Sequence, residues 1–244
     1  MTSKVSTLLT ADTPTYNLTL PLSKKEVTFR PFRVKEEKIL LLAMESDDPI
    51  EIYHALKNLI DSCSGEDSGS LPIVDIEYLF INIRARSVGE IVEPVVNCPI
   101  TKKKIPLKVD LTKIKPPSTK NILDNNIKIS ENVGVTLRYP TLNSLIKNKI
   151  VDTDMMSADN IIQMVASCIE EIYTKTESFN CDEIIPEEII EFVESMSAEH
   201  FEQVSKFFES IPSLEHKVKY YTPKDDGGKE QQTVTLSGLS DFFG

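Results

Sequence analysis

The stretch LPIVDIEYLFINIRARSVGE, residues 71–90, contains the clearest helix signal in the first half of the chain. Its large apolar residues recur at helical spacing and predict one buried face. These residues are Ile73, Ile76, Leu79, Phe80 and Ile83. Asp75 and Glu77 lie near the start and Arg84 and Arg86 near the end, which suits the helix dipole. We therefore expect a core helix that ends at the following glycine, with its two arginines facing outward.

The segment VVNCPITKKKIPLKVDL, residues 95–111, follows with two β-prone runs around a turn that begins at Cys98. Small zinc-binding hairpins have a second cysteine where this chain has Thr101. The segment is therefore a lost metal site, a site completed elsewhere, or a hairpin that happens to contain a cysteine. Zinc sites need four ligands, mostly Cys and His in closely spaced pairs. We favour a hairpin held by packing and backbone pairing.

A second hairpin of the same plan is expected near the C-terminus, in LEHKVKYYTP and QQTVTL. Glu93–Val96 with Ile105–Leu111 corresponds to Glu215–Tyr220 with Gln232–Leu236, and both follow an amphipathic helix. Tyr and Thr stand where cysteines of a zinc site would be expected. The layout indicates a weak duplication of two hairpins that resemble metal-free zinc-ribbon-like knuckles.

The remaining segments predict further helices and hairpins, so the expected fold class is α+β, with helices packed against several short antiparallel β-hairpins. The expected hairpins are TYNLTL with KEVTFR, and NIKISENVGVTLRYP with Gly134 in or near its turn. The expected helices are VKEEKILLLAMES, DDPIEIYHALKNLIDSC, Leu142–Lys147, Ala158–Tyr173, Glu187–Met196 and Ala198–Ser210. SGEDSGS lacks apolar residues and predicts a mobile surface loop.

The best internal boundary is KIKPPSTKN, a connector bearing Pro and Lys. We therefore divide the chain into residues 1–114, a connector 115–120, and residues 121–244. The first part holds the N-terminal hairpin, helices and the Cys98 hairpin, and the second holds a hairpin, a helical region and the C-terminal hairpin. The alternative is that both parts form one compact unit.

Composition restricts the classes of function. The 244 residues include 27 Lys and Arg against 38 Asp and Glu, a net charge of −11. This balance argues against a general DNA or RNA binder, because phosphate contacts supply most nucleic-acid affinity. No long apolar run predicts a membrane span or a secretory signal, so we expect a cytosolic protein. The four cysteines lack paired spacing, which favours free thiols.

No catalytic motif is present. The chain has no phosphate loop or dinucleotide fingerprint, and His54, His200 and His216 lie outside any known motif. The carboxylate pairs predict solvated faces and turns, although sequence does not show which carboxylates meet in space. We expect no enzymatic activity and no catalytic, cofactor or metal site. The alternative is a small enzyme or nucleic-acid-binding module whose site is built from dispersed Cys, His and carboxylate residues.

Several segments together resemble the baseplate hub assembly proteins of T4-type contractile-tailed phages. They are VTFRPFRVKEEKILLLAMES, VDIEYLFINIRARSVGE, the Cys-Pro hairpin and FFESIPSLEHKVKY with LSGLSDFF. The resemblance runs from about Val27 to the C-terminus, and Glu77–Glu90 is its most specific piece. Relatives often carry paired cysteines in the hairpins, and this chain departs from that pattern at Thr101 and in the second hairpin. Metal binding is therefore not carried over.

The resemblance implies a non-enzymatic phage tail protein that promotes or forms part of the central baseplate hub. The implied partners are baseplate hub proteins and, as a second candidate, the tape-measure protein, without nucleic acid or a membrane span. The implied location is the host cytoplasm during assembly, with the virion baseplate as the alternative. The Glu77–Glu90 helix and the two hairpin edges are the expected interaction surface, although that helix is equally well explained as core.

Candidate partner-binding residues are polar or apolar groups expected on this surface. They are Arg84, Arg86, Lys102, Lys103, Phe242 and Phe243. The arginines are chosen because Arg is enriched at interfaces. The two terminal phenylalanines either tuck back into the domain, which we favour, or dock on a partner.

Overall fold

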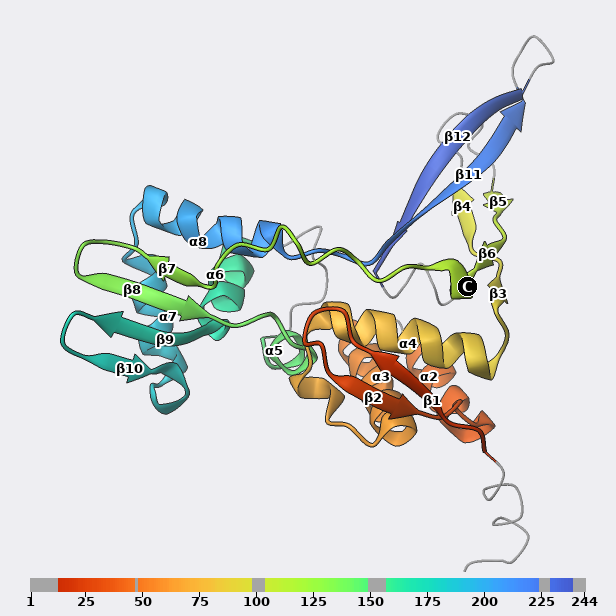
Figure 1. Ribbon diagram of the computed structural model, residues 1–244, viewed down its shortest axis with the longest axis horizontal. Helices are drawn as coiled ribbons and strands as arrows, with labels where there is room; N and C mark the ends of the chain where they lie inside the picture. Colours follow the sequence, from red (N-terminus) through yellow and green to blue (C-terminus); the bar gives the residue numbers. More distant parts are fainter. Residues whose placement is uncertain (1–12, 47, 98–103, 149–156, 224–228, 239–244) are drawn as a thin grey trace, which may run out of the picture.

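The computed structural model describes residues 13–46, 48–97, 104–148, 157–223 and 229–238. Within these ranges the fold is mixed α and β, as predicted, with seven helices and several small antiparallel sheets (Figure 1). One sheet has four strands, in the order β10-β9-β8-β7, and the others are two-stranded ribbons. The zinc-ribbon-like detail of the two hairpins stays a prediction.

The N-terminal elements follow the sequence prediction closely. They are β1 (Tyr16–Thr19), β2 (Glu26–Phe29), α2 (Val34–Glu45), α3 (Pro49–Ser64), the 3-10 helix η1 (Ser68–Ser70) and α4 (Ile73–Ser87). The carboxylate of Asp48 accepts a hydrogen bond from the backbone N–H of Ile50, and Pro49 occupies the first turn of α3. This cap explains why the helix begins at that point.

The first long hairpin is an interrupted ribbon. Its strands are β3 (Ile91–Val92), β4 (Val95–Asn97), β5 (Lys104–Pro106) and β6 (Val109–Asp110), followed by the 3-10 helix η2 (Leu111–Lys113). β4 pairs with β5 and β3 pairs with β6, and the backbone N–H of Leu107 donates to the carbonyl of Pro94 between the two ladders. The turn that contains Cys98 and Thr101 lies outside the described residues.

The middle of the chain forms the four-stranded sheet and its helices. The elements are β7 (Asn126–Lys128), β8 (Val133–Leu137), α5 (Leu142–Lys147), α6 (Ala158–Ser167), β9 (Ile169–Thr174), β10 (Ser178–Asn180), the 3-10 helix η3 (Cys181–Glu183), α7 (Pro186–Glu194) and α8 (Ala198–Ser210). Helices α5 and α8 have the predicted bounds. The last elements are β11 (Glu215–Pro223) and β12 (Lys229–Ser237), which form the predicted C-terminal hairpin.

The buried residues form two clusters. The first extends from Leu20 to Ile114 and also includes Leu214, Tyr220 and Leu236 of the C-terminal segment. The second extends from Ile129 to Phe207. We call the parts around these clusters the first lobe (residues 13–114 and 214–238) and the second lobe (residues 122–211). Figure 1 shows them side by side, joined by extended connections.

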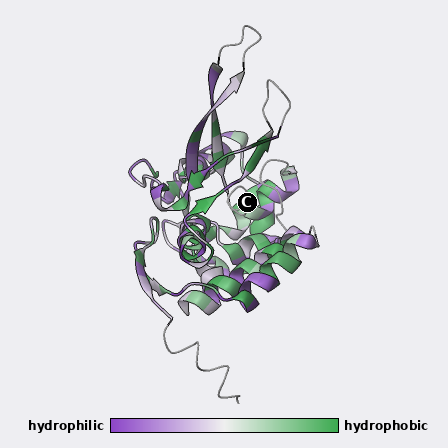
Figure 2. Cartoon of the chain, turned by 90° about the vertical axis from the view of Figure 1, so that its right-hand side faces the viewer, coloured by the Kyte–Doolittle hydropathy of each residue, from purple (hydrophilic) through white to green (hydrophobic). Residues whose placement is uncertain are grey.

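The C-terminal hairpin packs with the first lobe, although the predicted division groups it with residues 121–244. On its inner face Val218 pairs with Val234 and His216 with Leu236, and Leu236 joins the first cluster, with Val218 and Val234 packed against it. Figure 2 shows both hairpins rising side by side from the helical body. The C-terminal segment returns to the first lobe because this packing buries apolar surface against the first cluster. The boundary at 115–120 itself stays a prediction.

The helix predicted over Ala158–Tyr173 is wrong in its second half. Helix α6 ends at Ser167, and Ile169–Thr174 is strand β9 at the centre of the four-stranded sheet. Val135 of β8 pairs with Ile172 of β9. Pairing of β9 with strands on both sides overrides the helical spacing that Ile162, Ala166 and Ile169 suggest.

One local prediction also needs correction, and another holds. SGEDSGS is not a fully exposed loop: it contains η1, and Ser68 is completely buried with its hydroxyl donating to the carboxylate of Asp61. Gly134 is the second residue of β8, close to the turn as predicted, and a Cβ there would overlap the ring of Tyr173. Gly134 therefore lacks a side chain where the Tyr173 ring occupies the adjacent space.

Candidate interaction surface

Helix α4 is the centre of the first lobe, and its N-terminal end holds the N-terminal hairpin in place. The carboxylate of Asp75 is completely buried. It accepts hydrogen bonds from the backbone N–H groups of Leu22 at 2.7 Å and Ser23 at 2.9 Å. These two donors lie in the turn between β1 and β2, so Asp75 links that turn to the helix.

Glu77 begins the most specific piece of the sequence resemblance, and it links α4 to the returning C-terminal chain. Its carboxylate accepts a hydrogen bond from the backbone of Leu214. Burial raises the pKa of Glu77 to about 7, and the hydrogen bond from Leu214 only partly opposes this. The side chain is therefore partly protonated near neutral pH.

The raised pKa of Glu77 predicts a specific pH dependence of stability. Since the folded-state pKa lies above the ordinary value of 4.5, the stabilising protonated form is lost as pH rises from about 4.5 to 7. We expect Glu77→Gln and wild type to be similar in stability at pH 4, and Glu77→Gln to be the more stable at pH 8. Urea denaturation at both pH values measures the difference. Parallel stability curves for the two proteins would contradict the assignment.

The two arginines near the end of α4 have different environments. Arg84 is half-buried, and burial lowers its pKa although the nearby charge of Glu37 opposes this. Arg86 is exposed, with its guanidinium carbon 4.9 Å from the centre of the Tyr16 ring and its Nη1 3.4 Å from the Glu90 carboxylate. Of the two, Arg86 is the more exposed.

A row of exposed aliphatic side chains begins where α4 ends. Val88, Ile91 and Val95 are 57%, 55% and 59% exposed. We call these three residues the hairpin edge. They follow Arg86 in the chain, since α4 ends at Ser87 and β3 begins at Ile91. Exposed aliphatic groups that stand together mark interaction surfaces more often than isolated ones do.

Sequence reasoning expected the hairpins to take part in binding but did not single out Val88, Ile91 and Val95, although a signal was present. Ile91, Val92, Val95 and Val96 are apolar on both faces of the ribbon, whereas a hairpin with one solvated face alternates apolar and polar residues. Val92 is buried and Val96 packs against the first cluster, so the other two must face solvent.

The other predicted partner-binding residues cannot be placed. Lys102, Lys103, Phe242 and Phe243 lie outside the described residues. Among the six predicted residues, the structure therefore places Arg84 and Arg86 at the same end of α4. Their role in binding stays a prediction.

The described cysteines are buried free thiols. They are Cys63, Cys168 and Cys181. Burial raises the pKa of Cys63 to about 11 and that of Cys168 to about 12, and it also raises the pKa of Cys181. Because the thiolate is the nucleophile and the metal ligand, these three side chains are poorly suited to either role. Within the described ranges, no group of three or more His, Cys, Asp or Glu could hold a metal ion.

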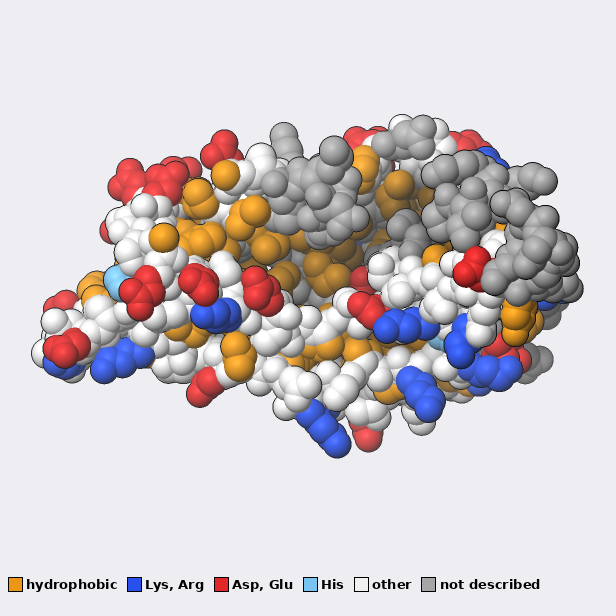
Figure 3. All heavy atoms as spheres, turned by 90° about the horizontal axis from the view of Figure 1, so that it is seen from above, with side chains coloured by type: hydrophobic (Ala, Val, Ile, Leu, Met, Phe, Trp, Pro, Cys, Tyr) orange, Lys and Arg blue, Asp and Glu red, His pale blue; other side chains and the backbone are white. Residues whose placement is uncertain are grey.

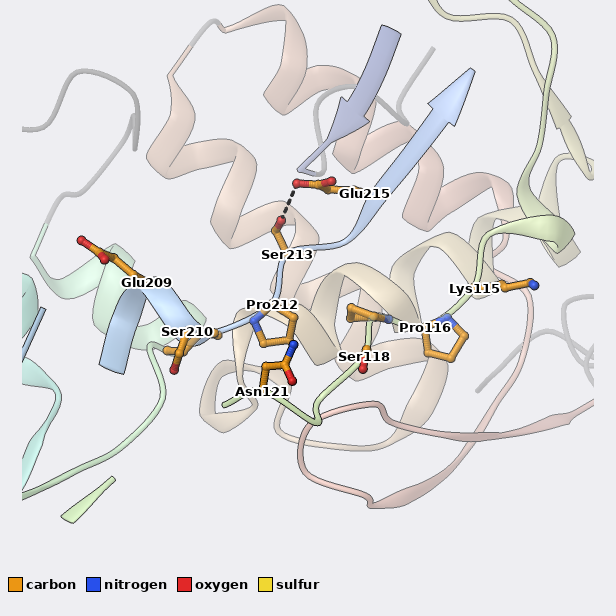
Figure 4. Close-up of a pocket in the computed structure, with 11 residues that line it drawn as sticks. Lys115, Pro116, Ser118, Asn121, Glu209, Ser210, Pro212, Ser213 and Glu215 are labelled. Atoms are coloured by element: carbon orange, nitrogen blue, oxygen red, sulfur yellow. Dashed lines mark hydrogen bonds between the residues drawn. The ribbon is translucent and has the colours of Figure 1, made fainter. Parts of the chain in front are cut away.

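A groove of about 520 Å³ lies where the two connections between the lobes run together (Figure 4). It is lined by the connector at Lys115–Ser118 and by the return segment from Glu209 to Glu215. The backbone N–H of Leu123 donates to the hydroxyl of Ser210 and ties the connections together. Glu209 and Glu215 stand apart in the close-up, so they do not form a catalytic pair.

A second cavity, of about 700 Å³, lies where α5 and α6 meet the segment from Cys181 to Ile190. Arg138 and Asn148 line it, and the Nε of Arg138 and the Nδ2 of Asn148 are buried without a hydrogen-bond partner among the described residues. Both atoms are closed to solvent, so they are not positioned to receive a ligand from it. The other guanidinium nitrogens of Arg138 are directed to Asp182 at 2.7 and 3.4 Å.

The lobes differ sharply in charge. Residues 121–211 contain 6 Lys and Arg against 17 Asp and Glu, whereas residues 13–120 and 212–238 together contain 20 against 19. The net charge of −11 therefore belongs to the second lobe. Seen from above, acidic side chains gather over the left end, and hydrophobic side chains line the hollow in the middle (Figure 3). The hairpin edge lies on the nearly neutral first lobe.

No helix in the described part of the chain is both long enough and apolar enough to cross a membrane. Comparison with protein families gives a match over residues 13–244 to the family described as T4 bacteriophage base plate protein. The comparisons with curated proteins and with solved structures found no significant match. The family match covers nearly the whole chain, including both lobes and both hairpins. The protein is therefore a member of the T4 bacteriophage base plate protein family.

Proposed function

We propose that this baseplate protein acts without catalysis in assembly of the central hub, by binding other hub proteins through its first lobe. The observation that carries the proposal is the hairpin edge. Val88, Ile91 and Val95 expose aliphatic surface on the segment that follows the exposed Arg86. An exposed apolar row next to an arginine has the composition of a protein–protein interface.

Open strand edges extend this surface. β4 with β5 and β11 with β12 are two-stranded ribbons, so each of these strands has one edge without a β partner in the described parts of the chain. Unpaired edges accept a further strand from another chain, which supplies main-chain hydrogen bonds. A hub component that docks on the hairpin edge would be held by apolar contacts and by such pairing.

The acidic second lobe supports the choice of a protein partner. A net charge of −11 over residues 121–211 repels nucleic acid. We propose that the partner is a baseplate hub protein, with the tape-measure protein as the second candidate. The protein would meet these partners in the host cytoplasm during assembly.

The hairpin edge gives a direct test. Ile91→Asp combined with Val95→Asp should abolish co-purification with co-expressed hub proteins, because it places charges in an apolar contact. Since both residues are more than half exposed, the melting temperature should change by less than about 4 °C. Arg86→Glu should weaken the same co-purification.

A matched control is Ile185→Asp, because Ile185 is 64% exposed but lies on the second lobe. It should leave co-purification intact. Undiminished binding by the Ile91 and Val95 double variant would overturn the proposed surface. Mass spectrometry of purified virions then distinguishes two roles for this chain. A permanent hub subunit would be detected in the virions, whereas a transient assembly factor would be absent from them.

A further inference from the structure

Helix α2 is apolar on two sides, and only one of them is used by the first lobe. Its inner residues Leu40 and Ala43 are buried, and α2 packs mainly on α3. Its outer side carries three large aliphatic residues with high exposure, and a fourth lies on a flank. The three are Val34 (79%), Leu41 (53%) and Leu42 (53%), and the fourth is Ile39 (52%). Four such residues on one helix of 12 form a concentrated apolar surface.

Two opposite charges lie on the same outer face. Val34, Lys38, Leu41 and Glu45 are spaced at i, i+4, i+7 and i+11, so they form one stripe along the helix. Lys38 and Glu45 are both exposed, and neither has an ion pair in the part of the chain that the structure describes. They are about 10 Å apart along the axis, which is too far for them to pair with each other.

We propose that α2 joins two copies of this chain in an antiparallel, two-fold symmetric contact. A two-fold axis between Leu41 and Leu42 brings these leucines against their counterparts. The same axis places Lys38 of one copy opposite Glu45 of the other, twice per dimer. An isologous contact must be self-complementary in this way. The stripe therefore has both the apolar centre and the reciprocal charges that a second copy requires.

The charge of the lobes also favours a second copy at this place. The second lobe, with a net charge of −11, would repel its counterpart, whereas the first lobe is nearly neutral. Figure 1 shows α2 behind α4 on the right, away from the second lobe on the left. Contact through α2 therefore joins the chains at the lobe where electrostatic repulsion is smallest.

The size of the stripe sets the expected affinity. Stable protein interfaces bury roughly 1,200–2,000 Å² in total, and a single helix of 12 residues from each copy offers less. We expect a reversible dimer with a dissociation constant in the micromolar range. This association is independent of the proposed hub role, because α2 and the hairpin edge share no residue.

Sedimentation velocity of the full chain over a concentration series tests the proposal. Wild type should change from monomer to dimer as concentration rises. Leu41→Glu with Leu42→Glu should abolish the dimer. Lys38→Glu and Glu45→Lys should each weaken it roughly tenfold, because each single change creates two like-charge contacts. The double variant Lys38→Glu/Glu45→Lys restores both pairs and should recover the wild-type constant.

Matched controls separate the contact from general effects. Leu123→Glu changes another exposed leucine, and Lys120→Glu makes the same charge change on the connector, so both should dimerise normally. Circular dichroism melts check that each variant is folded. A wild-type chain that stays monomeric at several hundred micromolar overturns the proposal. A dimer that the leucine changes do not affect, or that the charge exchange does not restore, also overturns it.

Discussion

Replacing Asp75 with Ala is expected to lower the free energy of unfolding by about 2–4 kcal/mol, measured by urea denaturation. The carboxylate is completely buried and accepts two backbone hydrogen bonds from Leu22 and Ser23. Alanine would leave both N–H groups without their acceptor and would release the β1–β2 turn from α4. Asp75→Asn keeps one acceptor oxygen and should lose about half as much.

The control for Asp75 is Asp159→Ala. Asp159 is also an acidic residue in the first turn of a helix, α6, but it is exposed. Its loss should cost only the helix-dipole contribution, about 0.3–1 kcal/mol. Equal losses for the two variants would show that the buried hydrogen bonds of Asp75 contribute little.

Replacing Phe207 with Ala should destabilise the second lobe by about 3–5 kcal/mol, because it removes a fully buried aromatic ring. Phe207 stacks on Tyr139 with ring centres 5.7 Å apart, and it packs edge-to-face against Phe208 with ring centres 5.3 Å apart. Pro140, the residue after Tyr139, forms a hydrogen bond to the first lobe. Its carbonyl accepts this bond from the backbone N–H of Ile73 in α4. Phe207 therefore also supports the junction between the lobes.

The matched variant is Phe80→Ala, which removes a buried ring from the first cluster. Hydrogen exchange read by mass spectrometry assigns the destabilised region. Phe207→Ala should raise exchange in β7 to β10, and Phe80→Ala should raise it in α3, α4 and the C-terminal hairpin. If β11 and β12 respond to Phe207→Ala instead, the assignment of this hairpin to the first lobe is wrong.

Local sequence signals, such as helix caps and apolar spacing, predicted the structure correctly where they were strong. Asp48 and Pro49 mark the start of α3, and the observed cap confirms it. The apolar spacing of Ile76, Phe80 and Ile83 predicts a buried face, and all three are at most 1% exposed. Capping and helical periodicity involve neighbours in sequence, so they are visible without tertiary information.

Strand β9 shows where local signals fail. Ile169–Thr174 continues the apolar spacing of α6, yet it pairs with both β8 and β10. Its partners are distant in sequence, and sequence alone does not show that they are close in space. The same limit applies to the candidate site, because the exposure of Val88, Ile91 and Val95 depends on which face of the ribbon the first cluster covers.

Residue spacing and short motifs were enough to predict the α+β class, most element boundaries and the pair of hairpins. They also carried the resemblance to T4-type baseplate proteins, which the family match confirms at the level of the baseplate family. The path of the chain became visible only in the folded structure: it leaves the first lobe at the connector and returns to it through Leu214, Tyr220 and Leu236. The tertiary structure also decided which apolar faces remain exposed, on α2 and at the hairpin edge. The reason is that burial depends on which distant segments share one core, and that choice minimises exposed apolar area over the whole chain.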